Sequence, residues 1–139
     1  KEPAGLCDGG LRPDGASIIP WKRGRNVTWD VTVADTFATS YVGDAAVCAG
    51  RVAERAAAKK IAKYAEMCRN YIFVPLACEV SGAWCTDGLE FLNDLGSRIS
   101  DVTGDRRDKD FLFQRLSIAL QKGNAACMYK PGPLIDTLE

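Results

Sequence analysis

The stretch Val27-Thr28-Trp29-Asp30-Val31-Thr32-Val33 decides the fold expected for this chain. Apolar and polar residues alternate strictly along it, which is the period of a β-strand with one buried face. A carboxylate is uncommon inside a strand and costly to bury alone, so Asp30 requires a partner or a functional role. The apolar face holds Val27, Trp29, Val31 and Val33, and the other face holds Thr28, Asp30 and Thr32.

Two further strands are predicted around this one. Residues 16–21 form a short apolar stretch, and the polar turn at 22–26 that follows it predicts a hairpin with the central strand. Residues 71–80 form the third strand. It contains Pro75, which cannot donate a ladder hydrogen bond, so this strand is expected at an edge of the sheet or to be irregular.

Three helices are expected in the remainder of the chain. After a connector over residues 35–43, Asp44 can cap a long helix that runs to about residue 68. A second helix is predicted from Thr86 or Asp87 to about residue 102. The last covers residues 110–122 and is expected to end at Gly123 and Asn124. The order strand, strand, helix, strand, helix, helix predicts an α/β fold with one hairpin and one helical crossover.

Length and composition fit one soluble domain. The chain has 139 residues, and 18 Lys and Arg balance 18 Asp and Glu. A strongly basic nucleic-acid-binding protein is therefore not indicated, and any basic surface must be local. No apolar run approaches the length of a membrane span, the N-terminus does not resemble a signal peptide, and no membrane partner is expected. Residues 1–129 are predicted to form a single domain with a loose segment over 1–10, followed by a tail over 130–139.

Six cysteines accompany a complete absence of histidine. No CxxC pair is present, so ordinary structural zinc sites lack support. Three disulfides are arithmetically possible, and with the sequon at Asn26 they leave open a secreted, disulfide-stabilised interaction domain. Cys48, Cys68 and Cys78 lie in apolar stretches and are typical of buried free thiols. Reduced cysteines and an intracellular location are therefore expected.

Two carboxylates are candidates for a metal site. The hairpin should bring Asp14, in Arg12-Pro13-Asp14-Gly15, near Asp30. Paired hard oxygen ligands suit Mg²⁺, which keeps other positions for water and phosphate oxygens, so the pair indicates phosphodiester chemistry. A simple turn role for Asp14, between proline and glycine, is the alternative.

Several motifs in this order resemble a known family. An aspartate followed on the next strand by Asp/Glu-x-Lys is the signature of PD-(D/E)XK nucleases. The whole set is similar to the restriction-like endonuclease domain that follows the reverse transcriptase in some non-LTR retrotransposons, over about residues 10–126. The matching segments are Arg12-Pro13-Asp14, Trp29-Asp30-Val31-Thr32, Lys63-Tyr64, Ser81-Gly82-Ala83-Trp84, Arg115-Leu116-Ser117-Ile118-Ala119 and Gly123-Asn124-Ala125-Ala126.

This resemblance implies a small restriction-endonuclease-like core and a nuclease that nicks DNA with Mg²⁺ or Mn²⁺. Asp14 and Asp30 would be the metal ligands. DNA and the remainder of a reverse-transcriptase polyprotein would be the partners, and the location would be nuclear. The family's helix and acidic residue before the first strand are not evident. A catalytically inactive domain of the same fold, binding nucleic acid or protein, is the alternative.

One position departs from the family pattern. Thr32 stands where the pattern expects lysine. In some members of the fold the following helix supplies that lysine, so Lys63 becomes the third catalytic candidate, with Lys60 as the substitute. Thr32 itself could contact a metal-bound water, and Glu79 on the third strand is a possible further ligand.

Two basic clusters could contact DNA phosphates, although basic loops are commonly only solvated. The first lies in the hairpin turn, and the second lies between and along the last two helices. Their members are Lys22, Arg23, Arg25, Arg106, Arg107 and Arg115.

Overall fold

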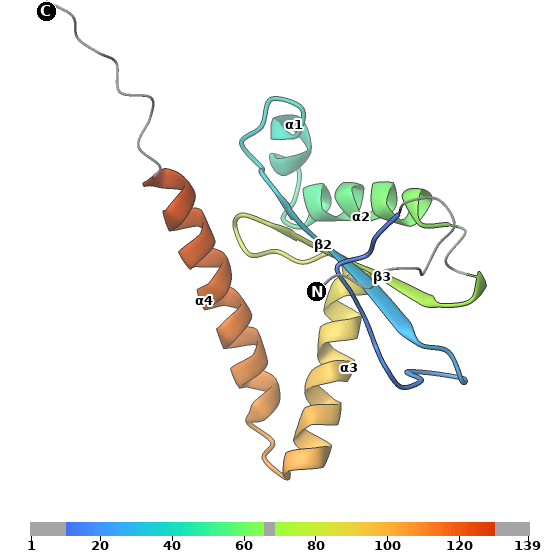
Figure 1. Ribbon diagram of the computed structural model, residues 1–139. Coiled ribbons are helices and arrows are strands. Elements are labelled where there is room, and N and C mark those ends of the chain that lie inside the picture. Colours follow the sequence, from blue (N-terminus) through green and yellow to red (C-terminus); the bar gives the residue numbers. More distant parts are fainter. Residues whose placement is uncertain (1–10, 66–68, 130–139) are drawn as a thin grey trace, which may run out of the picture.

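A computed structural model describes residues 11–65 and 69–129 (Figure 1). Seven helices and strands are present in these ranges. The strands are β1 (Gly15–Ala16), β2 (Val27–Ala34) and β3 (Ile72–Glu79), and the helices are α1 (Val42–Ala45), α2 (Arg51–Lys63), α3 (Thr86–Thr103) and α4 (Asp108–Met128).

The strands form one mixed sheet in the order β1-β2-β3. β1 pairs antiparallel with β2, with Gly15 opposite Trp29. β2 pairs parallel with β3 along eight residues, with Asp30 opposite Pro75, and α2 provides the crossover between these two strands. The predicted α/β fold with one hairpin, one helical crossover and two C-terminal helices is therefore confirmed. β3 is an edge strand, as Pro75 indicated.

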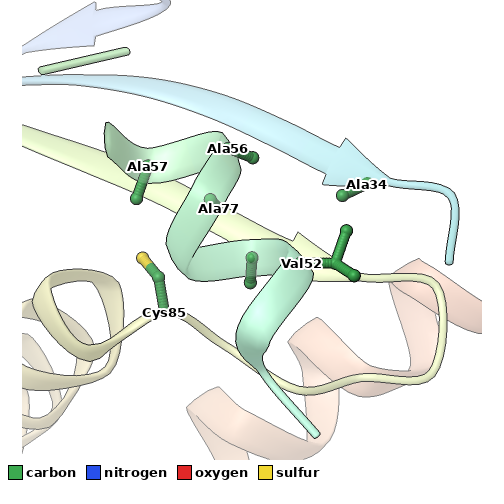
Figure 2. Packing of buried hydrophobic residues seen from close by; sticks show 7 residues of the cluster. Ala34, Val52, Ala56, Ala57, Ala77 and Cys85 are labelled. Atoms are coloured by element: carbon green, nitrogen blue, oxygen red, sulfur yellow. The ribbon is translucent and has the colours of Figure 1, made fainter. Parts of the chain in front are cut away.

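One face of the sheet is covered by α2 (Figure 2). Small side chains on both sides allow the helix axis to come close to the strands. Val52 of α2 lies next to Ala34 of β2, and Ala57 lies near Cys85 at the start of α3. This packing fixes which side of α2 faces the sheet. The buried members of the cluster are Ala34, Val52, Ala53, Ala56, Ala57, Ala77 and Cys85.

The opposite face of the sheet packs against α3 and part of α4 (Figure 1). Its buried centre consists of Val27, Val74, Leu76 and Leu92. Val27 and Trp29 of β2 belong to this cluster, whereas Val31 and Val33, expected on the same buried face, are about half exposed, at 47% and 49%. All three tryptophans pack at the margin of this second cluster: Trp21, Trp29 and Trp84.

Three predicted boundaries were wrong. The first strand is only two residues long, because the chain turns away from β2 after Ala16 and leaves Ile18 97% exposed. The helix expected over 44–68 is two helices, since Gly50 at φ 88° begins α2 after a turn. The last helix continues through Gly123, and Asn124 Nδ2 donates to the carbonyl of Val80, 2.9 Å away.

The four cysteines in the described ranges are free thiols. Three disulfides are therefore excluded, and the expectation of reduced cysteines is confirmed for these four. Cys48 is exposed, contrary to the prediction, whereas Cys78 is buried. Burial, with a smaller contribution from Cys85, raises the pKa of Cys78 to about 11, so this thiol remains protonated near neutral pH. Cys68 lies outside the described residues.

Within residues 11–65 and 69–129, no helix combines the length and the apolar character that a membrane span requires.

Candidate functional site

Asp14, one residue before β1, lies beside β2 next to Asp30. Gly15 pairs with Trp29, and continuing this antiparallel register by one residue sets Asp14 against Asp30. Asp14 Oδ2 also accepts a hydrogen bond from the backbone N–H of Val31, 2.6 Å away. The Asp14 carboxylate is thus held beside Asp30 on β2.

Asp30 is buried, with only 5% of the residue exposed. Lys60 Nζ lies 2.5 Å from its Oδ2 in an ion pair whose angles are not those of a hydrogen bond. The Tyr64 hydroxyl lies 3.2 Å from its Oδ1 and donates to it. A buried carboxylate needs such partners to remain charged. Lys60 compensates the charge, and a quarter of its side chain, 26%, remains exposed to solvent.

Tyr64 connects the end of α2 with β2 and with the segment at Arg12 that precedes β1. It is 1% exposed and follows α2 directly. Its hydroxyl lies 3.0 Å from the carbonyl of Arg12 and within donating distance of Asp30, and its single proton serves one of these acceptors at a time. Its ring stacks on Phe73 of β3, with centroids 4.7 Å apart. The segment that carries Asp14 is therefore fixed against β2 through Tyr64.

The helical period explains why Lys60 rather than Lys63 meets Asp30. Ala56, Lys60 and Tyr64 are spaced by four residues and lie on the side of α2 that faces the sheet. Lys63 is exposed, and its ammonium lies 5.1 Å from the centroid of the Tyr64 ring. The structure therefore brings Asp14, Asp30 and Lys60 together, whereas Lys63 does not contact Asp30.

A row of buried polar atoms runs along β2 beneath α2. Thr28 Oγ1, Asp30 Oδ2 and Thr32 Oγ1 have no hydrogen-bond partner among the described residues. Such atoms are rare in a protein interior and mark places where a water or an ion completes the bonding. Thr32 thus lies on the same side of the sheet as Asp30, as the strand period predicted.

The donor set suits a weakly held magnesium ion better than a fully enclosed one. Among residues 11–65 and 69–129, no group of three or more histidine, cysteine, aspartate or glutamate side chains is arranged to hold a metal ion. Mg²⁺ is commonly bound by one or two carboxylates and keeps several waters. Asp14 and Asp30 are the carboxylates that could hold an ion in this mode, and the ion would take the place of Lys60 at Oδ2 of Asp30.

Glu79 lies at the other end of the sheet. It pairs with Ala34, four residues from Asp30, which is about 13 Å along a strand. Its Oε1 accepts from the backbone N–H of Val52, 3.0 Å away in the first turn of α2, and its Oε2 accepts from Ser81. Glu79 therefore accepts a hydrogen bond from a free backbone N–H at the N-terminus of α2, and it does not lie near the two aspartates.

Two of the predicted DNA-contacting residues pair with carboxylates other than the two aspartates. Lys22 forms an ion pair of 3.2 Å with Asp94 of α3, and Arg107 pairs with Asp105 in the α3–α4 turn. Burial opposes ionisation of Asp94, but hydrogen bonds from Arg98 and Lys22 outweigh it and lower its pKa. All six residues predicted to contact DNA are exposed: Lys22, Arg23, Arg25, Arg106, Arg107 and Arg115.

Sequence reasoning missed Tyr64 as a site residue and ranked Lys60 behind Lys63. A signal for both was present, because the small apolar residues at 52, 53, 56 and 57 predict positions 60 and 64 on the same inward side. Comparison of the chain with protein-family models, with curated proteins and with solved structures finds no match.

Proposed function

We propose that this chain is a metal-dependent DNA endonuclease domain of the restriction-like type, derived from a retroelement. The observation that supports the proposal is the juxtaposition of Asp14, Asp30 and Lys60 at one point of the sheet. Two carboxylates can hold the metal for phosphodiester hydrolysis, and a lysine can stabilise the negative charge that develops. The resemblance of the sequence motifs favours the same chemistry. A nuclear location follows as part of this proposal.

Each residue has a distinct role in this proposal. Asp14 and Asp30 hold Mg²⁺ or Mn²⁺, and the bound ion would activate water and stabilise charge on the phosphate. Lys60 neutralises Asp30 before DNA binds and, from a partly exposed position, contacts a phosphate oxygen. Tyr64 is a positioning residue, since it orients Asp30 and fixes the backbone at Arg12.

Nicking of supercoiled plasmid DNA tests the proposal. Asp30→Asn keeps the size of the side chain and removes its charge, so nicking in Mg²⁺ or Mn²⁺ is expected to fall about 100-fold. Asp101→Asn is the matched control, because Asp101 is exposed on α3. EDTA should abolish nicking by the unaltered chain. Equal nicking by Asp30→Asn and the unaltered chain would refute the proposed function.

The second candidate is a domain of the same fold that binds nucleic acid or protein without catalysis. The network of Tyr64, Asp30 and Lys60 favours it, because Lys60 already compensates the buried charge without a metal. Calorimetric titration of the folded chain with Mn²⁺ separates the two candidates. Heat of binding that disappears in Asp30→Asn favours the nuclease, and no binding favours the non-catalytic domain.

A further inference from the structure

A row of basic residues runs along α2 at every fourth position. All its members are exposed, and successive members are about 6 Å apart along the helix axis. α2 contains one acidic residue, Glu54. Its carboxylate accepts hydrogen bonds from the backbone N–H and the hydroxyl of Thr86 rather than pairing with these basic side chains. The row, hereafter the α2 basic row, consists of Arg51, Arg55, Lys59 and Lys63.

The first three side chains of the α2 basic row are held in place by the segment that follows β2. Arg51 and Arg55 both pair with Asp44, at 3.4 and 2.8 Å. The guanidinium of Arg55 and the ammonium of Lys59 also lie 5.3 and 5.2 Å from the ring centroid of Tyr41. Asp44 pairs with two of the four cations, so the α2 basic row keeps a net positive charge. Side chains already held in this way lose little conformational entropy when they bind an anion.

The α2 basic row ends at the candidate site. Lys63 lies beside Tyr64, whose hydroxyl reaches Asp30, and Lys59 precedes Lys60, which pairs with Asp30. α2 covers the same face of the sheet as the polar side of β2 (Figure 2). The turn between α3 and α4, with its arginines, belongs to the helices on the other face (Figure 1).

We propose that the α2 basic row binds the phosphates of a DNA strand whose backbone runs along α2 to Asp14 and Asp30. The inference deepens the proposed function and rests on it for the choice of DNA as partner. A linear series of exposed cations at regular spacing matches the regularly spaced charges of a nucleic-acid backbone. Lysine and arginine contacts of this kind carry affinity without sequence preference.

Fluorescence anisotropy with a labelled 20-base-pair duplex, measured in EDTA over a range of KCl concentrations, tests this proposal. The double variant Lys59→Gln/Lys63→Gln is expected to bind roughly tenfold or more weakly near 0.1 M salt. The slope of log affinity against log salt should decrease by about 2, one for each lost phosphate contact. Glutamine retains the helix propensity of lysine, and circular dichroism checks that the variant is folded.

The double variant Arg106→Gln/Arg115→Gln is the matched control, since it removes the same charge from the other face. Unchanged binding by this control, with the loss in Lys59→Gln/Lys63→Gln, would support the proposal. Equal losses in both variants would indicate dependence on net charge alone and would overturn it, as would a loss confined to the control. Because EDTA removes the metal, this outcome is independent of whether Asp30→Asn abolishes nicking.

Discussion

At the scale of single residues, the contact between Asp30 and Lys60 has the largest consequence. It is a partly buried ion pair, and breaking such a pair from one side leaves an uncompensated charge in the interior. The pair is therefore a structural requirement of the fold as well as a proposed part of catalysis. Variants of the two lysines on α2 separate these roles, because Lys60 contacts Asp30 and Lys63 does not.

Lys60→Gln is expected to lower the free energy of unfolding by about 2 kcal/mol, because Asp30 loses its counter-charge while Lys60 is itself partly solvated. Lys63→Gln, which removes an exposed charge, should stay within about 0.5 kcal/mol of the unaltered chain. Urea denaturation gives both values. In the plasmid assay, under conditions where both variants are folded, Lys60→Gln should also lose more nicking. Equal stability of the two variants would contradict the ion pair.

The residues of the site could be predicted from the sequence to different degrees. Asp30 was predictable because strand alternation alone places it. The predicted hairpin would have set Asp14 opposite Ala34, and its position beside Asp30 depends on a β1 of only two residues and a longer connection to β2. The choice between Lys60 and Lys63 required the rotation of α2 about its axis, which the sheet-facing alanines determine. The role of Glu79 could not be predicted, because its hydrogen bond with Val52 joins β3 to a helix far away in the sequence.

At the scale of elements, the two long strands were predictable and the helix boundaries were less so. β2 is one residue longer than predicted at its end, and β3 is one residue shorter at each end, since their patterns are strong. The break before α2 depends on Gly50 at positive φ, and a glycine in an otherwise helical sequence does not reveal its φ. The end of α4 was misjudged because a glycine costs a helix only about 1 kcal/mol, and the hydrogen bond from Asn124 to Val80 joins residues far apart in sequence.

Two glycines of the long helices, Gly96 of α3 and Gly123 of α4, provide a matched test of how α3 meets α4. A Cβ added at Gly96 would lie 2.8 Å from Lys109 Cγ and 3.2 Å from its Cα, so α4 must shift. Nothing lies within 4 Å of a Cβ at Gly123. Gly96→Ala should therefore destabilise the fold by about 1–3 kcal/mol, and Gly123→Ala should stabilise it by up to about 1 kcal/mol. Thermal unfolding of both variants measures this, and stabilisation by Gly96→Ala would refute the close helix contact.

At the scale of the whole molecule, the core is concentrated around the sheet and thins toward α4. Two clusters enclose the sheet, one under α2 and one under α3. α4 is the longest helix described, yet none of its 21 residues is buried. Its attachment depends on half-buried residues such as Phe113 and Leu116 and on the hydrogen bond from Asn124. The molecule therefore consists of a firm three-stranded core with a less firmly attached helix (Figure 1).

Hydrogen exchange should follow this distribution. Amides of β2, β3 and α2 exchange only on global unfolding, whereas those of α4 open locally, because few apolar contacts are lost when the helix frays. Protection factors in α4 are expected to be at least about tenfold lower than in β2. Mass spectrometry of peptides at two protein concentrations measures this difference.

Protection of α4 equal to that of β2 at both concentrations would contradict the weak attachment. Protection that rises with concentration would instead show that α4 associates with a second copy through its exposed apolar side chains, which include Phe111 and Ile118.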